Sequence, residues 1–197
     1  MSVTTLSLIG VAALLIFWAV GAYNRLVRLK NIIANAFGQI DVQLKRRYDL
    51  IPNLVEAARK YLHHESSTLE AVIAARNQAR SASAAVRAGP TRASAVVALA
   101  AAEQSLDGSL GRLFALAEAY PELKADQTIR ELSEELTSTE NKIAFSRQAY
   151  NDAVLDYNDA QGQFPALLVA RLFGFAPSAM LQATQSAAER DAIRIAI

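Results

Sequence analysis

Residues 6–22 read Leu6-Ser-Leu-Ile-Gly-Val-Ala-Ala-Leu-Leu-Ile-Phe-Trp-Ala-Val-Gly-Ala22 and lead, without a turn signal, into an amphipathic pattern that begins at Tyr23. The run carries no charged side chain, and its length is close to the roughly 20 residues that a helix needs to cross a bilayer. Trp18 and Tyr23 fall near one membrane interface, where amphipathic rings favour the headgroup level. We therefore expect residues 1–22 to be a transmembrane anchor whose helix continues into the following domain.

Positive side chains follow the apolar run and do not precede it. Arg25, Arg28 and Lys30 come shortly after it, and the positive-inside bias then places the amino terminus outside and the bulk of the chain in the cytoplasm. A cleaved signal peptide is the competing interpretation. It fits less well because the charged n-region is missing and the apolar run is somewhat long for an h-region. We expect a retained, single-pass anchor.

The composition after the anchor indicates a single all-helical domain. The chain of 197 residues has only eight glycines and five prolines, and it lacks an alternating Val/Ile/Thr run bounded by turns. Its formal net charge of +1 argues against nucleic acid as the main partner, because phosphate binding needs a concentrated basic face. The absence of cysteine excludes disulfides, thiolate chemistry and thiolate metal sites.

Capping and turn signals in the sequence place the first two helical segments. The first runs from the membrane through Leu62 on an apolar stripe with steps of three or four, and we expect Pro52 to kink this helix without ending it. A polar corner follows. The second segment opens at the pattern Ser67-Thr-Leu-Glu70, which reads as a capping box, and it stops before Gly89-Pro90.

The third segment carries an apolar stripe from Val96 to Tyr120, and we expect Pro121 to close it. Glu103 interrupts that stripe. Two alternatives remain open for this carboxylate: it is the partner of a buried base, or it is a surface residue in a loose register.

The fourth segment starts near Asp126 and holds a seven-residue rhythm. Its row of large residues is Ile129, Leu136, Ile143, Tyr150, Tyr157 and Phe164, and its second row is Leu132, Thr139, Ser146, Ala153 and Ala160. These rows are the a and d positions of a helical seam. The tetrapeptide Tyr-Asn-Asp-Ala occurs at 150–153 and again at 157–160, which we interpret as local packing periodicity.

Helices joined by short connections fold back on one another, so the four segments predict an antiparallel, up-down-up-down four-helix bundle over residues 23–163. The fourth helix would then return to the membrane. The segment 164–176 is apolar and too short to span a bilayer. It either contacts lipid at the membrane interface or caps the open end of the bundle. Residues 177–197 form a carboxyl-terminal tail. Candidate membrane contacts are Trp18, Tyr23, Leu168, Arg171, Leu172 and Phe173.

The sequence lacks the motifs of common catalytic and cofactor sites. His64-Glu65 would need a second histidine four residues after the first to resemble a zinc-protease helix, and Thr68 is there. A di-iron bundle needs Glu-x-x-His pairs, but Lys60 and Tyr61 stand three residues before the two histidines. The chain also has no Gly-rich phosphate loop after a strand and no Gly-x-Ser-x-Gly motif. We predict that the protein is not an enzyme and has no catalytic residue, metal site or cofactor.

The faces of the expected bundle nevertheless contain many polar side chains, and Arg47 falls where the seam would be. Charges in or near a bundle core must be paired and hydrogen-bonded, and such networks fix the register between helices in some proteins. We interpret these residues as a structural polar network, with a solvated face and a ligand site as the alternatives. The residues are Asn35, Asp41, Arg46, Arg47, Asp49, Asn53, Glu56, Glu140, Asn141, Arg147 and Asn151.

At these residues the chain resembles the LemA family. The resemblance implies a bacterial inner-membrane protein with a single amino-terminal span and an antiparallel helical bundle. It also implies relatives in magnetosome membrane formation and frequent association with membrane metallopeptidases. The chain departs from the family pattern at its carboxyl end, where Ser178-Ala-Met-Leu-Gln182 and an alanine-rich tail replace an aromatic-rich stretch. The motifs that carry the resemblance are Tyr23-Asn-Arg-Leu-Val-Arg-Leu-Lys-Asn31, Asn35 to Glu56, Tyr120 to Ala125, Glu135 to Asn141, Arg147 with Tyr150-Asn151, and Phe164-Pro165.

Two functional classes follow from these observations. The first is a self-associating scaffold, in which bundles anchored side by side organise or remodel the membrane. The second is a sensor or adaptor bundle that binds a protein or peptide partner, such as a membrane metallopeptidase, and transmits through the first helix. The first predicts a homo-oligomer, whereas the second predicts a small oligomer that depends on a heterologous partner. Small residues that permit close approach of spans are Gly10, Ala12, Ala13, Ala19 and Gly21.

Overall fold

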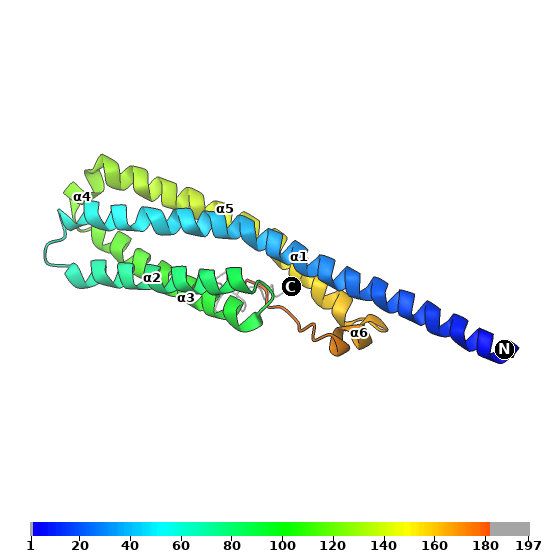
Figure 1. The fold of residues 1–197 in the computed structure, drawn as a ribbon. Helices are drawn as coiled ribbons and strands as arrows, with labels where there is room; N and C mark the ends of the chain where they lie inside the picture. Colours follow the sequence, from blue (N-terminus) through cyan, green and yellow to red (C-terminus); the bar gives the residue numbers. More distant parts are fainter. Residues whose placement is uncertain (1, 182–197) are drawn as a thin grey trace, which may run out of the picture.

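The computed structural model describes residues 2–181, and all regular structure in this range is helical. The all-helical prediction is therefore confirmed for this part of the chain. Figure 1 shows that the chain reverses direction between α1 and α2, between α2 and α3, and between α3 and α5. The helices are α1 (Val3–Arg59), α2 (Ser66–Ala88), α3 (Ala93–Ala117), α4 (Pro121–Ala125), α5 (Gln127–Gly162) and α6 (Ala166–Leu172).

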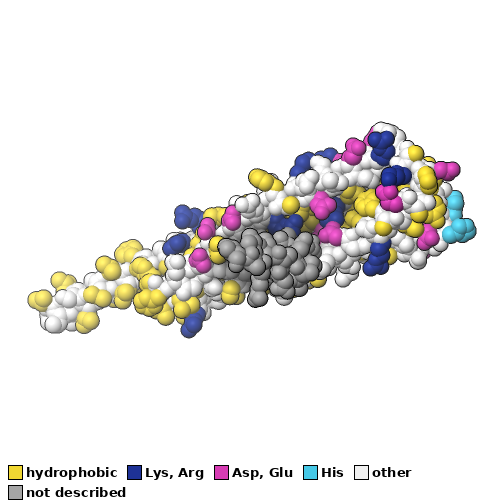
Figure 2. All heavy atoms as spheres, turned by 180° about the vertical axis from the view of Figure 1, so that it is seen from behind, with side chains coloured by type: hydrophobic (Ala, Val, Ile, Leu, Met, Phe, Trp, Pro, Cys, Tyr) yellow, Lys and Arg dark blue, Asp and Glu magenta, His cyan; other side chains and the backbone are white. Residues whose placement is uncertain are grey.

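Helix α1 joins the apolar run to the first helix of the domain without a break, and it passes through Pro52. With 57 residues, it is about 86 Å long. All side chains from 2 to 18 are exposed, and Figures 1 and 2 show this end as an apolar rod that projects beyond the other helices. Within the described residues, α1 is the one helix that is long and apolar enough to cross a membrane.

The long helices pack in the order α5, α1, α2, α3. Helix α1 lies along α5 and also packs on α2, while α2 packs on α3. Helices α3 and α5, as far as the structure describes the chain, do not pack extensively on each other. The side between α3 and α5 is therefore less filled than the rest of the domain. Side chains of the common core include Ile33, Phe37, Ile40, Leu44, Val72, Val96, Leu99, Leu106, Leu136, Tyr150 and Tyr157.

The seven-residue rhythm of α5 marks its buried face. The large row is buried from Ile129 to Tyr157, and Thr139, Ala153 and Ala160 of the second row are buried as well. The prediction that Phe164 belongs to the same buried row of the helix is wrong. Because α5 ends at Gly162, the next position of the rhythm has left the helix, and the Phe164 side chain is 81% exposed.

The corner between α1 and α2 differs from the expected one. Helix α1 ends at Arg59, and Leu62 is buried in the turn that follows. Helix α2 starts at Ser66, after Glu65, and no side chain caps it by a hydrogen bond. The predicted capping box is therefore wrong, because Ser67 lies inside the first turn and not at the position that flanks the helix.

The connection between α3 and α5 contains a short helix that the sequence patterns did not predict. Helix α3 ends at Ala117, and Pro121 is the first residue of α4, where a missing N–H removes no helical hydrogen bond. Asp126 then caps α5, since its carboxylate accepts a hydrogen bond from the Ile129 N–H at 3.1 Å. The predicted start of the fourth long helix near Asp126 is confirmed.

Candidate functional site

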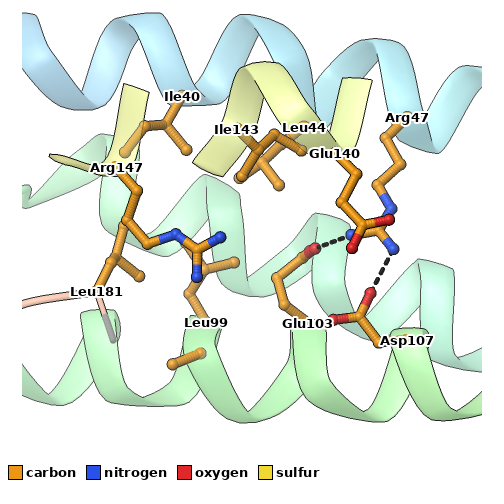
Figure 3. A pocket seen from close by; sticks show the side chains of 11 residues that line it. Ile40, Leu44, Arg47, Leu99, Glu103, Asp107, Glu140, Ile143, Arg147 and Leu181 are labelled. Atoms are coloured by element: carbon orange, nitrogen blue, oxygen red, sulfur yellow. Dashed lines mark hydrogen bonds and ion pairs between the residues drawn. The ribbon is translucent and has the colours of Figure 1, made fainter. Parts of the chain in front are cut away.

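Arg47 is the centre of a buried polar cluster between α1 and α3. Its guanidinium donates through Nη1 to Glu103 Oε2 at 3.1 Å and through Nη2 to Asp107 Oδ1. The Tyr48 hydroxyl donates to the other oxygen of the Glu103 carboxylate. Glu103 and Asp107 are four residues apart and therefore share one face of α3. Figure 3 shows both carboxylates turned toward the guanidinium of Arg47.

Burial sets the electrostatics of this cluster. Burial disfavours the charged form of Arg47, but attraction to Asp107 and Glu103 outweighs it, so the pKa of Arg47 is raised. Burial also raises the pKa of Glu103, against the opposing effects of the Tyr48 hydrogen bond and the Arg47 charge. Burial and then Glu103 raise the pKa of Tyr48, which keeps its hydroxyl protonated as a donor. The cluster is thus a charge-paired structural link between two helices.

A cavity of about 80 Å³ adjoins the cluster on the side between α3 and α5. Figure 3 shows Arg47 entering it from α1 and Arg147 from α5. The volume suits a few water molecules or one side chain, and it is well below the roughly 300–1,000 Å³ of small-molecule sites. No group of three or more His, Asp or Glu among the described residues could hold a metal ion. Its lining is Ile40, Leu44, Arg47, Leu99, Ala100, Glu103, Asp107, Glu140, Ile143, Arg147 and Leu181.

The structure separates the polar residues singled out from the sequence into three groups. Arg47, Glu140 and Arg147 line the cavity. A second group pairs elsewhere: Asp41 with Ser83 and Arg87, Arg46 with Glu135, Asp49 with Arg76, and Asn151 with the backbone of Leu181. The third group, Asn35, Asn53, Glu56 and Asn141, is exposed and belongs to a solvated face. Sequence reasoning missed Tyr48 and Asp107.

Arg76 satisfies a backbone group that Pro52 leaves without its helical partner. Proline has no N–H, so the carbonyl of Tyr48, four residues earlier, receives no hydrogen bond from position 52. The Arg76 Nε of α2 donates to this carbonyl at 2.8 Å. The side chain of Arg76 is largely buried, and its Nη2 lies 3.9 Å from Asp49. A side chain of the neighbouring helix thus makes the proline tolerable inside α1.

A second cluster lies where α1 leaves its apolar run. The ring of Tyr23 packs edge-on against Phe173 and Phe175, with centroid distances of 4.9 and 5.5 Å. Helix α6 packs on α1 and α5, and its buried residue Ala170 lies with Leu26 of α1 in one apolar cluster. Its other face is open: Leu168 is 58% and Leu172 79% exposed, and Arg171 is exposed as well. Trp18 lines a groove beside this junction with Phe164 and Pro165.

Comparison with known proteins places the chain in a family. The family model of the LemA family matches residues 36–196. The chain belongs to the LemA family. A relative of this family, Protein LemA of Metamycoplasma hominis, is 28% identical over 169 residues, which cover 86% of the chain and 73% of that protein. LemA is not a known enzyme family.

Two further relatives of this LemA chain are magnetosome proteins. Magnetosome protein MamQ of Magnetospirillum gryphiswaldense is 32% identical over 78 residues, and Magnetosome protein MamQ 2 of Paramagnetospirillum magneticum is 33% identical over 78 residues. Each match covers 40% of the chain and 29% of the relative. The chain therefore matches under a third of the length of these magnetosome proteins.

Proposed function

We propose that this LemA protein is a non-enzymatic, membrane-anchored scaffold of the bacterial inner membrane. In this proposal the first part of α1 is a single span with its amino terminus outside. The four long helices form an up-down-up-down bundle on the cytoplasmic side, and the bundles associate laterally to organise or remodel the membrane. The bundle is held to the bilayer at two places, the span and α6.

The observation that carries the proposal is the position of α6. Helix α6 packs on α1 directly after the apolar run, where Tyr23 contacts Phe173. Large apolar side chains that are more than half exposed lie beside this junction: Phe164, Leu168 and Leu172. Contiguous exposed apolar surface marks a membrane or protein contact. Because this surface lies beside the end of the apolar run, lipid is the contact that the position favours.

The charges around the junction support the same orientation. Arg25, Arg28 and Lys30 are exposed on α1 after the apolar run, and Arg171 is exposed on α6. Positive side chains at this level attract the anionic headgroups of a cytoplasmic leaflet, each with about 1 kcal/mol. The similarity to relatives named for the magnetosome, a subcellular structure and not a reaction, supports a structural role.

Self-association is tested on the full-length chain in mild detergent. Light scattering gives the mass of the protein in the particle, and negative-stain images give its shape. We expect a homo-oligomer with a regular outline. A monodisperse monomer would rule out the scaffold, whereas a small oligomer that forms only with a second protein would favour the adaptor.

The second membrane contact is tested with a fluorophore at a single introduced cysteine, because the chain has none of its own. Leu168→Cys labels α6, and Phe145→Cys is a matched control on an exposed apolar position of α5 in the bundle. In proteoliposomes we expect a blue-shifted emission and quenching by nitroxide-labelled lipid for position 168 only. Equal, weak quenching at both positions would contradict a lipid contact of α6.

A sensor or adaptor is the second candidate function. It is favoured by the continuity of α1, which connects the span to Arg47 within one helix. A partner bound at the cytoplasmic bundle, such as a membrane metallopeptidase, would then act on the same helix that enters the bilayer. Co-purification of a fixed partner, together with the monomer or small oligomer described above, would decide for this role.

A further inference from the structure

The segment from Phe175 to Leu181 is neither helix nor strand, and α5 holds its backbone. Tyr157 donates its hydroxyl to the carbonyl of Ala176 at 2.9 Å. The Asn158 amide donates to the carbonyl of Ser178 and accepts from its N–H, both at 2.9 Å. These contacts reach main-chain atoms only.

The same pair of side chains repeats one heptad earlier. The Tyr150 hydroxyl lies 3.3 Å from the carbonyl of Ala179 and 3.2 Å from that of Pro90, so it shares its one proton between these two acceptors. The Asn151 amide donates to the carbonyl of Leu181 at 3.0 Å and accepts from its N–H at 2.9 Å. The two copies of Tyr-Asn that looked like packing periodicity in the sequence thus form a backbone clamp. We call Tyr150, Asn151, Tyr157 and Asn158 the Tyr–Asn clamp.

The clamp works because two different periods match in length. Seven residues of α-helix rise about 10.5 Å, and three residues of extended chain span about 10 Å. Each heptad of α5 therefore meets one tripeptide of the segment, which runs antiparallel to the helix: Asn158 meets Ser178, and Asn151 meets Leu181. Ile143 and Ala144 stand at the next heptad, have no polar side-chain group and end the clamp.

The clamp selects its ligand by backbone shape and by two side chains. Ser178 and Leu181 are buried, whereas Ala176, Pro177 and Met180 are exposed. The Leu181 side chain lines the cavity beside Arg47. A suitable ligand is therefore an extended chain with a small residue followed, three positions later, by an aliphatic one, and with free N–H groups at both positions.

We propose that the Tyr–Asn clamp is an intermolecular contact, and that in the assembled protein it holds the segment 175–181 of a neighbouring copy. This inference rests on the proposed scaffold function and specifies how its copies bind each other. A second copy carries the sequence that makes all these contacts. Copies anchored in one membrane also present clamp and segment at the same height above the bilayer.

The connection to α6 allows this exchange between adjacent copies. Gly174 joins α6 to the segment with a φ of 71°, a conformation that favours glycine, and a Cβ there would meet nothing within 4 Å. Four extended residues from Gly174 to Ser178 reach about 14 Å. Packed helices lie about 8–10 Å apart, so the segment reaches a clamp on a helix in direct lateral contact.

Cross-linking between differently tagged copies tests the exchange. One full-length chain carries Leu155→Cys, which lies on the same stripe of α5 as Asn151 and Asn158, and the other carries Met180→Cys. Both native side chains are exposed, and neither belongs to the clamp. After co-expression, a short bismaleimide is added to the membranes. We expect a dimer with both tags, at a yield at least fivefold above that of a control pair with Phe145→Cys in place of Leu155→Cys.

Two further variants connect the product to the clamp. Asn151→Asp with Asn158→Asp keeps the size of both side chains but removes the donors to the segment, and we expect the dimer yield to fall at least fivefold. Circular dichroism of this variant shows whether the domain is folded. A synthetic peptide of residues 175–181 should compete with the exchange, and the same peptide with Ser178→Pro and Leu181→Pro, which lacks both N–H groups, should not.

The failure of this inference is distinct from a failure of the scaffold. A chain with both cysteines that gives only an internally cross-linked monomer, while light scattering shows an oligomer, would overturn the exchange and leave the scaffold standing. A monomer in both experiments would overturn both proposals. A cross-linked product of the Leu155→Cys chain with a different protein, and none with Met180→Cys, would assign the clamp to a foreign peptide and overturn the exchange.

Discussion

Arg47 and Arg46 are neighbours in the sequence with opposite surroundings. The Arg47 side chain is 8% exposed and bonds Glu103 and Asp107, whereas Arg46 is 56% exposed and pairs with Glu135 at the surface. We expect Arg47→Met to lower the free energy of unfolding by about 3 kcal/mol, because it leaves a buried carboxylate without its counter-charge. Thermal or urea unfolding of the full-length chain in detergent measures this difference.

Arg46→Met is the matched control for that substitution. Exposed ion pairs contribute about 0–1 kcal/mol, so this variant should unfold close to the parent chain. Equal losses for the two arginines would contradict a special role of the buried cluster. A loss for Arg47→Met that disappears when Glu103→Gln and Asp107→Asn are added would show that the unpaired carboxylates cause it.

Glu103 predicts a dependence of stability on pH. Its pKa in the folded chain is raised above the ordinary value of 4.5, chiefly by burial. The folded state therefore holds the proton to higher pH than the unfolded state, so this group stabilises the fold fully below pH 4.5, and the contribution is lost as the pH rises through the folded pKa. We expect the stability of the parent chain relative to Glu103→Gln to fall between pH 4.5 and neutrality.

Unfolding curves of the parent and of Glu103→Gln across that range give the measurement. Both chains share all other titrating groups. The contributions of those groups therefore cancel from the difference in the free energy of unfolding between the two chains. A difference between parent and Glu103→Gln that rises with pH would contradict the raised pKa.

At the scale of single residues, the sequence singled out only one partner in each of two hydrogen bonds of the Arg47 cluster. The apolar rhythm showed that Arg47 and Glu103 interrupt buried stripes, and one of the alternatives for Glu103, a partner for a buried base, is what the structure has. Asp107 and Tyr48 were missed. Their partners are 60 and 55 residues away in the chain, and no local pattern indicates which helices face each other.

Pro52 is the residue that couples two elements, α1 and α2. Removing Arg76 should leave the Tyr48 carbonyl unsatisfied, so we expect Arg76→Met to destabilise the domain by about 1–3 kcal/mol. Pro52→Ala supplies the missing N–H within α1. In the Pro52→Ala background, Arg76→Met should therefore lose less stability, with a coupling energy of about 1 kcal/mol in a double-mutant cycle.

The cycle separates this bond from the other contacts of Arg76. The Arg76 side chain also lies 3.9 Å from Asp49. Both backgrounds keep Asp49, so the contribution of this contact to stability cancels from the coupling energy. Unfolding of the four chains under one set of conditions provides the data. Additive losses, with no coupling, would mean that the Arg76 bond to the Tyr48 carbonyl does not replace a helical hydrogen bond.

Periodicity predicted which face of an element is buried, but not what covers that face. The rhythm of α5 correctly placed Ile129, Leu136 and Ile143 in the core. It placed Tyr150 and Tyr157 there too, yet their hydroxyls and the asparagines beside them hold the segment 175–181. A hydroxyl on a buried row and an amide next to it, repeated after seven residues, were the available signal. The backbone that they bind has no periodicity of its own.

The arrangement of the whole molecule follows from one continuous helix. Because α1 is unbroken from the apolar run to Arg59, the apolar run and the helical domain share an axis at their junction. Helix α6 then packs on the same helix at that junction. The sequence predicted that the fourth long helix returns to this end, since each short connection reverses the chain. It left open whether 164–176 contacts lipid or caps the bundle, because that depends on the angle at which the chain leaves α5.

In the proposed arrangement, two contacts with the membrane restrict the tilt of the helical domain, which the span alone would not. From Tyr23 to Arg59, α1 extends about 55 Å, so a fluorophore at His64→Cys, in the exposed corner after α1, reports the height of the far end. We expect Leu168→Asp with Leu172→Asp to release α6 from the lipid, since a charged carboxylate is disfavoured in an apolar environment. The far end should then approach the bilayer over a wider range of distances. Time-resolved energy transfer from position 64 to acceptor lipids in proteoliposomes should show a broader distribution with a higher mean efficiency.

Val42→Asp with Val97→Asp alters two exposed apolar residues of α1 and α3 and should leave the distribution unchanged. A narrow distribution that is the same in all three proteins would mean that the span alone orients the bundle.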